Sequence, residues 1–161
     1  MTPIILLDNL ADFIQQKTKD ILLEARAPLG EKAERRPAEV HKMRLPQKED
    51  STKRVPYILL QILTGEDTEE EDGTPVSMCK VRIVAATYSE DQKNGAYDVL
   101  NLIMRIRTEL ERVGIIADQF CLRRPLEYLI YPDDIAPYYF GEMITNWTIP
   151  EIKTEVEEIW L

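Results

Sequence analysis

The sequence predicts an α+β fold in which a mixed or antiparallel β-sheet is flanked by an N-terminal helix and a long central helix. Three patterns support this: an apolar stripe at helical spacing near the start, a strand-like alternation leading into a second helical pattern over residues 78–113, and an aromatic-rich strand pattern near the end. The chain has 161 residues, 44% of them hydrophobic, which is enough for one domain with its own core. We therefore expect residues 1–161 to form a single α+β domain.

The first predicted helix begins at the start of the chain. Thr2 and Pro3 are typical of an N-cap and a first helical residue. Leucine and isoleucine side chains then recur at helical spacing as far as Leu22, with acidic, amide and lysine side chains on the other side. Pro28 and Gly30 end the pattern. We expect this helix to cover one face of the sheet.

Residues 31–56 differ in composition from the rest of the chain. They include eight basic and five acidic residues and three prolines, with few large apolar side chains. Such a segment cannot bury enough surface to order by itself, which predicts a mobile basic arm or loop. Two interpretations stay open: a solvated surface loop, or an arm that orders when it binds a neighbouring subunit or an acidic surface. The basic residues considered for such an interface are Arg35, Arg36, Lys42, Arg44, Lys53 and Arg54.

An acidic hairpin loop is predicted between two strands. Residues 57–63 form an apolar run of strand length, and residues 64–75 then contain six acidic residues and no basic one, with glycines near both ends. Several carboxylates together suggest Ca²⁺ binding, but the loop lacks the alternating ligands, central glycine and final glutamate of an EF-hand. A solvated, self-repelling loop tip is the other interpretation. The residues of this loop considered for an interface are Glu69, Glu70, Glu71 and Asp72.

The stretch of residues 78–113 organises the predicted domain. Its first part alternates apolar and polar side chains and is rich in β-branched residues, which predicts a strand with one face more buried than the other. Ser89 and Gln92 match a capping box, in which both side chains bond free amides of a starting helix. Apolar side chains recur at helical spacing through Val113, and Gly114 is placed for a left-handed C-cap. This strand-to-helix unit is the strongest structural signal in the sequence.

Two further strands and a tail follow. Residues 126–131 alternate as a strand, prolines and aspartates break the pattern over 132–137, and residues 138–149 form a long aromatic-rich strand. Both faces of the last strand carry apolar groups, so we expect it to be central or partly covered by a partner. The acidic tail, residues 151–161, ends in apolar side chains that include Trp160. This end either folds back on the domain or docks on a neighbour.

Charge and cysteine content limit the class of protein. The formal net charge of −9 argues against a general nucleic-acid binder, which needs clustered lysine and arginine. No apolar run is long enough for a membrane span, and the first residues lack the basic region of a secretion signal, so we expect a cytoplasmic product. Cys79 and Cys121 could form a bridge or remain two small buried thiols in a reducing compartment.

The residue types needed for catalysis are sparse. His41 has no serine, cysteine or carboxylate nearby at a spacing typical of a triad, and the sequence shows neither a metal-ligand cluster nor a glycine-rich phosphate loop. The best enzymatic candidate is a metal-dependent nuclease that uses Asp133 or Asp134 with Glu142. The strand that contains Glu142 lacks the lysine such nucleases need, and the two aspartates suit a turn. We therefore predict no enzymatic activity, no metal and no cofactor.

A pattern in the second half of the chain points to a family. The strand and turn of residues 81–91, the helix start at 95–100, the segment 124–126 and the aromatic strand through 147–150 follow one another. This order resembles the tail terminator (tail completion) proteins of long-tailed bacteriophages. The resemblance covers roughly the last hundred residues.

The resemblance implies a structural subunit that forms a hexameric ring and caps the tail tube at its head-proximal end. Its partners would be copies of itself, the tail tube protein and the head-tail connector protein, first in the host cytoplasm and then in the virion tail. The basic arm and the acidic hairpin have opposite charge, as complementary patches of a ring could. Two alternatives stay open: another connector or neck protein of the same virion and, more distantly, the nuclease.

Overall fold

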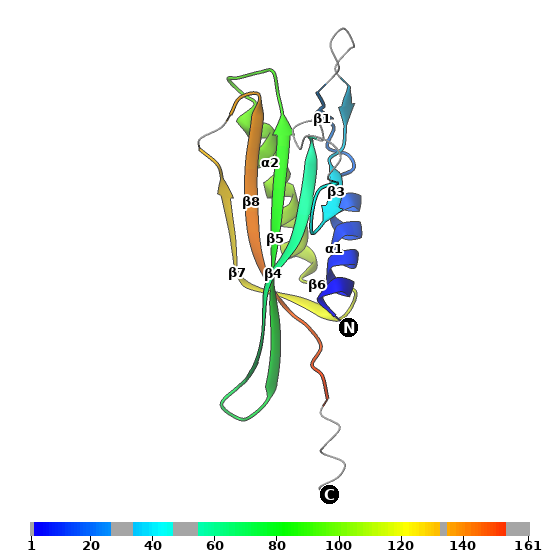
Figure 1. The fold of residues 1–161 in the computed structure, drawn as a ribbon, viewed down its shortest axis with the longest axis vertical. Helices are drawn as coiled ribbons and strands as arrows, with labels where there is room; N and C mark the ends of the chain where they lie inside the picture. The colour runs from blue at the N-terminus through cyan, green and yellow to red at the C-terminus, as the bar shows by residue number, and fades with distance from the viewer. Residues whose placement is uncertain (1, 27–33, 47–54, 133–134, 154–161) are drawn as a thin grey trace, which may run out of the picture.

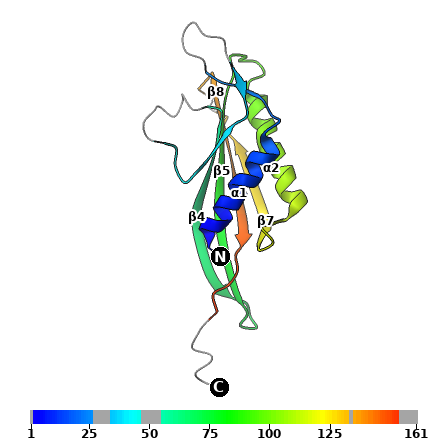
Figure 2. The same cartoon turned by 90° about the vertical axis from the view of Figure 1, so that its right-hand side faces the viewer.

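The chain folds into two layers, an α+β arrangement of one mixed β-sheet with two helices on one of its faces (Figures 1 and 2). No helix in the described part of the chain is both long and apolar enough to cross a membrane. The computed structural model describes residues 2–26, 34–46, 55–132 and 135–153. The helices are α1 (Pro3–Thr18) and α2 (Ala96–Val113).

The sheet has six strands, and its neighbours are antiparallel except for one edge pair. In spatial order the strands are β3 (Glu39–Lys42), β4 (Tyr57–Glu69), β5 (Pro75–Tyr88), β8 (Tyr138–Thr148), β7 (Phe120–Ile130) and β6 (Ile115–Ile116). Strands β3 and β4 are parallel, so the sheet is mixed. A separate antiparallel pair is formed by β1 (Leu23–Glu24) and β2 (Arg35–Arg36).

The helices begin and end at positions that the sequence predicts only in part. The N-terminal prediction for α1 is confirmed, because the Thr2 side chain accepts a hydrogen bond from the amide of Ile5 at 3.4 Å and Pro3 is the first helical residue. The predicted continuation toward Leu22 is wrong, since α1 ends at Thr18. Residues 23–24 instead pair with β2 as a strand. The apolar periodicity of the local sequence does not reveal this partner, because the partner lies further along the chain.

Helix α2 begins later than its predicted capping box. The Ser89 hydroxyl accepts a hydrogen bond from the amide of Asp91 at 3.2 Å, and Asp91 in turn bonds the amides of the next residues, so a turn replaces the first helical turn. The helix starts at Ala96 and has 18 residues, against 16 in α1, so neither is a dominant long central helix. Its predicted end is confirmed, because Gly114 has φ of 68° and its amide bonds the carbonyl of Leu110 at 2.9 Å.

The described part of residues 31–56, expected as a mobile basic arm or loop, contains two short strands. Arg35–Arg36 pairs with β1, and Glu39–Lys42 forms the parallel edge strand β3 beside residues 57–60. Backbone hydrogen bonds to β4 offset the conformational entropy that β3 loses on ordering. The polar local sequence could not offset this loss by burying apolar surface. Residues 31–33 and 47–54 lie outside the described residues.

The predicted acidic loop is mostly a β-ladder. Pairing of β4 with β5 continues to the pair Glu69–Pro75, and only residues 70–74 make the turn. Pairing of β5 with β8 stops at Met78, so the end of the hairpin projects beyond the sheet (Figure 1). We call residues 64–75 the acidic arm. The strands predicted at 78–88 and 138–149 are confirmed with small changes at their ends.

The main core lies between the sheet and the two helices. Trp147 on β8 and Phe120 on β7 are its largest fully buried side chains, packed with aliphatic residues of α1, α2 and the central strands. A second, smaller cluster lies apart from this core and includes Tyr57 and Tyr88. The apolar groups predicted on both faces of the last strand fit this arrangement, because Phe140 packs on the second cluster and Tyr139 on the main core.

Candidate functional site

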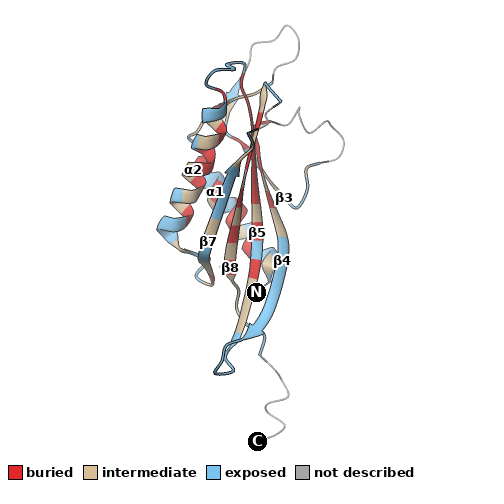
Figure 3. Cartoon of the chain, turned by 90° about the vertical axis from the view of Figure 1, so that its left-hand side faces the viewer, coloured by how far each residue is buried: buried red, intermediate tan, exposed pale blue. Residues whose placement is uncertain are grey.

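One face of the sheet carries no helix, and we call it the open face. Ile83 of β5 and Met143 of β8 are paired and point into the helix-covered core, so their sequence neighbours Arg82 and Glu142 lie on the opposite side. The second cluster covers the end of this face near Tyr88. The rest of the face is partly accessible (Figure 3) and is therefore the surface available for contacts.

An ion pair lies at the centre of the open face. The Nε of Arg82 donates a hydrogen bond to Glu142 at 2.6 Å, and the two terminal nitrogens donate to Gln61 and to the Tyr131 hydroxyl, each at 3.1 Å. The hydrogen bond to Glu142 raises the pKa of Arg82 and outweighs partial burial, which acts in the opposite direction. These bonds connect β4, β5 and β8 with the residue that follows β7, so they fix the geometry of the face.

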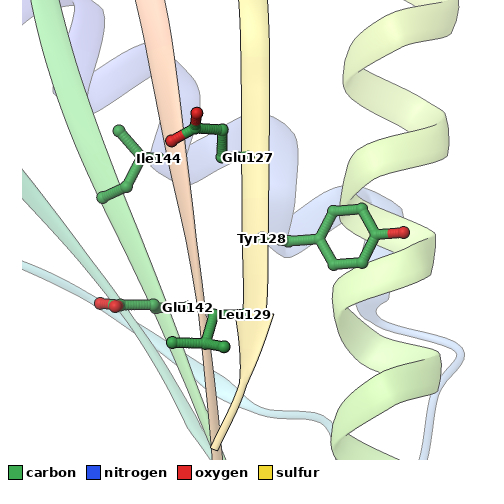
Figure 4. Close-up of a pocket in the computed structure, with 5 residues that line it drawn as sticks. All are labelled: Glu127, Tyr128, Leu129, Glu142 and Ile144. Atoms are coloured by element: carbon green, nitrogen blue, oxygen red, sulfur yellow. The ribbon is translucent and has the colours of Figure 1, made fainter.

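Beside this ion pair lies an open depression of about 450 Å³ between β7 and β8 (Figure 4). Glu142 and Ile144 of β8 and Leu129 of β7 contribute to its lining, and Leu129 is 52% exposed. Tyr128 points away from it toward α2, where the guanidinium of Arg107 lies 5.9 Å from the ring centre. A shallow surface with mixed apolar and acidic lining suits contact with another macromolecule. It suits a catalytic site less well, because such sites are usually enclosed clefts.

Two of the predicted interface residues form contacts within the chain. The guanidinium of Arg36 donates to the carbonyls of Pro56 and Val55 at 3.1 and 3.2 Å and lies 3.8 Å from Glu39. The ammonium of Lys42 bonds Asp8 of α1 at 2.7 Å. Both side chains therefore stabilise the packing of the β2–β3 segment on the body.

The other predicted residues that the structure describes are exposed, but their two charged sets are not brought together. Arg35 and Arg44 are exposed near β2 and β3, and all four acids named for the hairpin are exposed at its tip. The acidic tip begins at Glu69, nine residues beyond the β3-paired Leu60, which corresponds to ~30 Å along the strand. Lys53, Arg54 and Trp160 lie outside the described residues.

The sequence reasoning missed a row of polar side chains at the arm end of the open face. Lys80 of β5, Asn146 of β8 and Arg123 of β7 are direct cross-strand neighbours, and exposed Arg124 follows Arg123. We call Lys80, Arg123 and Arg124 the basic row. The sequence signal was the double arginine before Pro125, but only the sheet register places it beside Lys80.

Asp133 and Asp134 lie outside the described residues, and the Glu142 carboxylate is held by Arg82. In the described ranges no three side chains of the metal-binding types gather into a site. His41 lies on β3, 3.4 Å from Glu39.

The two cysteines are both free thiols, so the bridge considered from the sequence does not form in this structure. Cys79 is only 2% exposed, and burial raises the pKa of its thiol to about 11. The neutral thiol therefore predominates at physiological pH, as expected of a packing residue rather than a nucleophile.

No protein-family model matches the sequence, and no curated protein is significantly similar to it. The function must therefore be argued from the surfaces of the chain itself.

The Arg82 network should stabilise the open face measurably. We expect Arg82→Ala to lower the free energy of unfolding by about 1–2 kcal/mol, because it leaves the half-buried Glu142 carboxylate without its ion-pair partner and removes bonds to Gln61 and Tyr131. Urea denaturation followed by far-UV circular dichroism measures this change. Lys80→Ala, on the same strand and face without an ion pair in the described chain, is the control and should stay within about 0.5 kcal/mol. Equal losses in the two variants would contradict a stabilising role for the network.

Proposed function

We propose that this protein is a non-enzymatic structural subunit of the tail terminator (tail completion) type, which assembles into a ring and caps the tail tube of a long-tailed bacteriophage at its head-proximal end. In this role it forms the tail side of the head-tail junction. The observation that carries the proposal is the acidic arm, which extends from a two-layer body and is exposed along its whole length. An exposed ladder of this kind suits a protein that works by contact with other subunits.

The distribution of surfaces supports a ring more than a two-fold dimer. A head-to-tail ring needs two different patches on each subunit, one for each neighbour. The arm is acidic and projects beyond the sheet (Figure 1), whereas the open face ends in the basic row, so the two surfaces differ in shape and in charge. The resemblance of residues 81–150 to tail terminators suggests that the larger particle is a phage tail. Helix α2 corresponds to the helix in the sequence pattern that carries this resemblance.

The proposal is tested with tubes assembled from the tail tube protein of the same virus. We expect the purified protein to sediment as a ring-sized oligomer and to appear in negative-stain electron micrographs as density at one end of each tube, with tube growth stopped at that end. The same tubes without the protein are the control and should keep growing from both ends. A protein that stays monomeric and never decorates a tube end would contradict the proposal. Binding only to isolated head-tail connector would favour a neck protein of the same virion instead.

A further inference from the structure

The open face ends in a row of cations that no described residue of the chain neutralises. Lys80, Asn146 and Arg123 face the same side at matching positions of three neighbouring strands, and Arg124 is exposed next to them. In the described residues none of the three cations takes part in an ion pair. By contrast, Arg82, one row further along the same strand, is paired with Glu142. The basic row is thus an unpaired positive site on a protein whose net charge is −9.

The acidic arm carries unpaired negative charges, in contrast to the positive charges of the basic row. Glu69, Glu70 and Glu71 are exposed and form no ion pair with any described residue. Two other acids shape the arm itself, since Asp72 accepts a hydrogen bond from the amide of Thr74 at 3.0 Å and Asp67 bonds Ser77. The three free glutamates therefore present uncompensated negative charge on a hairpin whose form is fixed by its own hydrogen bonds.

Glu69, Glu70 and Glu71 at the tip of the arm cannot reach the basic row of their own chain. Lys80 is paired with Thr64 at the base of the same hairpin, and the ladder runs without a break from there to the pair Glu69–Pro75. This places the acidic tip on the order of 15–20 Å from Lys80 along the strand. Bending back would break the backbone hydrogen bonds of the ladder, so the tip of the arm can meet a basic row only on another copy of the chain.

We propose that the acidic arm of one copy docks across the basic row of the next copy, with Glu69, Glu70 and Glu71 against Lys80, Arg123 and Arg124. This contact is heterologous, so repetition of it can close a ring, and the inference rests on the ring of the proposed function. The opposite charges align the two surfaces and exclude arm-to-arm pairing, in which like charges would meet. Exposed Glu127 borders the adjoining depression, so its charge keeps the acidic arm on the row rather than in the depression.

The proposal is tested with two charge-reversed variants of the whole chain. The arm variant carries Glu69→Lys, Glu70→Lys and Glu71→Lys, and the row variant carries Lys80→Glu, Arg123→Glu and Arg124→Glu. Sedimentation velocity at low ionic strength should show that each variant alone associates about tenfold or more weakly than the unmodified protein. An equimolar mixture of the two variants should recover the ring, because the basic arm of one variant meets the acidic row of the other, and the acidic arm of the second meets the basic row of the first. Association of the unmodified protein should also weaken as salt is added.

A matched control separates the local contact from net charge. Asp12→Lys, Glu34→Lys and Glu111→Lys together reverse three exposed acids away from the arm and change the net charge by the same amount as the arm variant. This control should associate like the unmodified protein, and circular dichroism should show that all variants are folded.

The outcomes distinguish this inference from the proposed function. Rings that form in both variants, or a mixture that does not recover them, would overturn the arm-to-row contact even if the unmodified protein caps tubes. Recovery in the mixture without tube capping by the unmodified protein would support the contact and contradict the tail terminator role. A chain that remains monomeric at all concentrations would overturn both.

Discussion

Trp147→Ala should lower the free energy of unfolding by about 3–5 kcal/mol, a typical range for truncating a fully buried aromatic side chain. Trp147 lies on the central strand β8, between the sheet and the helices, and has no exposed surface. Its indole nitrogen donates a hydrogen bond to the Thr145 hydroxyl at 2.7 Å, and that hydroxyl donates to the carbonyl of Val81 at 3.0 Å. Truncation therefore removes apolar contacts and also leaves a buried hydroxyl with one partner fewer.

The measurement is urea denaturation followed by far-UV circular dichroism, which does not depend on the tryptophan that is removed. Leu129→Ala, on the neighbouring strand β7, is the control, because Leu129 is 52% exposed and should cost less than about 1 kcal/mol. Trp147→Phe should fall between the two, since it keeps a ring but not the hydrogen bond. A loss below about 1 kcal/mol for Trp147→Ala would show that the packing of β8 against the helices is not as described.

Gly95→Ala should destabilise the protein by about 2–3 kcal/mol, although alanine favours helices. Gly95 is the residue before α2 and has helical backbone angles, so a methyl group gains at most ~1 kcal/mol of helix propensity. An added Cβ would lie 2.7 Å from the carbonyl oxygen of Asp91 and 2.7 Å from the ring of Tyr139, which is buried in the main core. Relief of this overlap must shift backbone or a packed aromatic ring, and such overpacking costs more than the propensity gain.

Gly65→Ala is the matched control for this prediction. At Gly65 the added Cβ would meet only the carbonyl of Met78 at 3.6 Å, which is an ordinary contact, and no other group lies closer. We expect the thermal midpoint of this variant to stay near that of the unmodified protein, while Gly95→Ala lowers it by several degrees, about 2–4 °C per kcal/mol for a chain of this size. Midpoints that fall equally would indicate a general effect of glycine replacement. A stabilised Gly95→Ala would show that the turn before α2 has room for a side chain.

In the proposed ring, the packing of the sheet holds the two contact surfaces, the basic row and the acidic arm, in position. The Arg82 network and the buried Trp147 belong to strands β5 and β8, which also position Lys80 and Asn146 at the arm end of the open face. A rigid sheet at this point keeps the cations of the basic row at fixed spacing. The acidic arm is an extension of β4 and β5 of the same sheet. The acidic arm and the basic row are therefore held by one continuous set of backbone hydrogen bonds.

Local residue patterns were sufficient where a short-range signal decides the structure. Thr2 and Pro3 set the start of α1, and Gly114 sets the end of α2, because capping depends on residues that are neighbours in sequence. The alternating pattern of β5 and the aromatic strand β8 were recognisable for the same reason. The capping box at Ser89 failed because the Ser89 amide, which the Gln92 side chain would bond, instead bonds the carbonyl of Pro137, while Asp91 bonds the amides of Lys93 and Asn94 and closes a turn.

The sequence by itself determined the α+β class, the main central strands, the N-cap of α1, the C-cap of α2 and the presence of opposite charges. Only the tertiary structure decided that residues 39–42 are an edge strand, that the acidic segment is a projecting ladder and that Lys80 lies in one row with Arg123. The physical reason is that strand partners are distant in sequence. Backbone hydrogen bonds across a sheet depend on register, and register is set by the packing of the whole core rather than by any one segment.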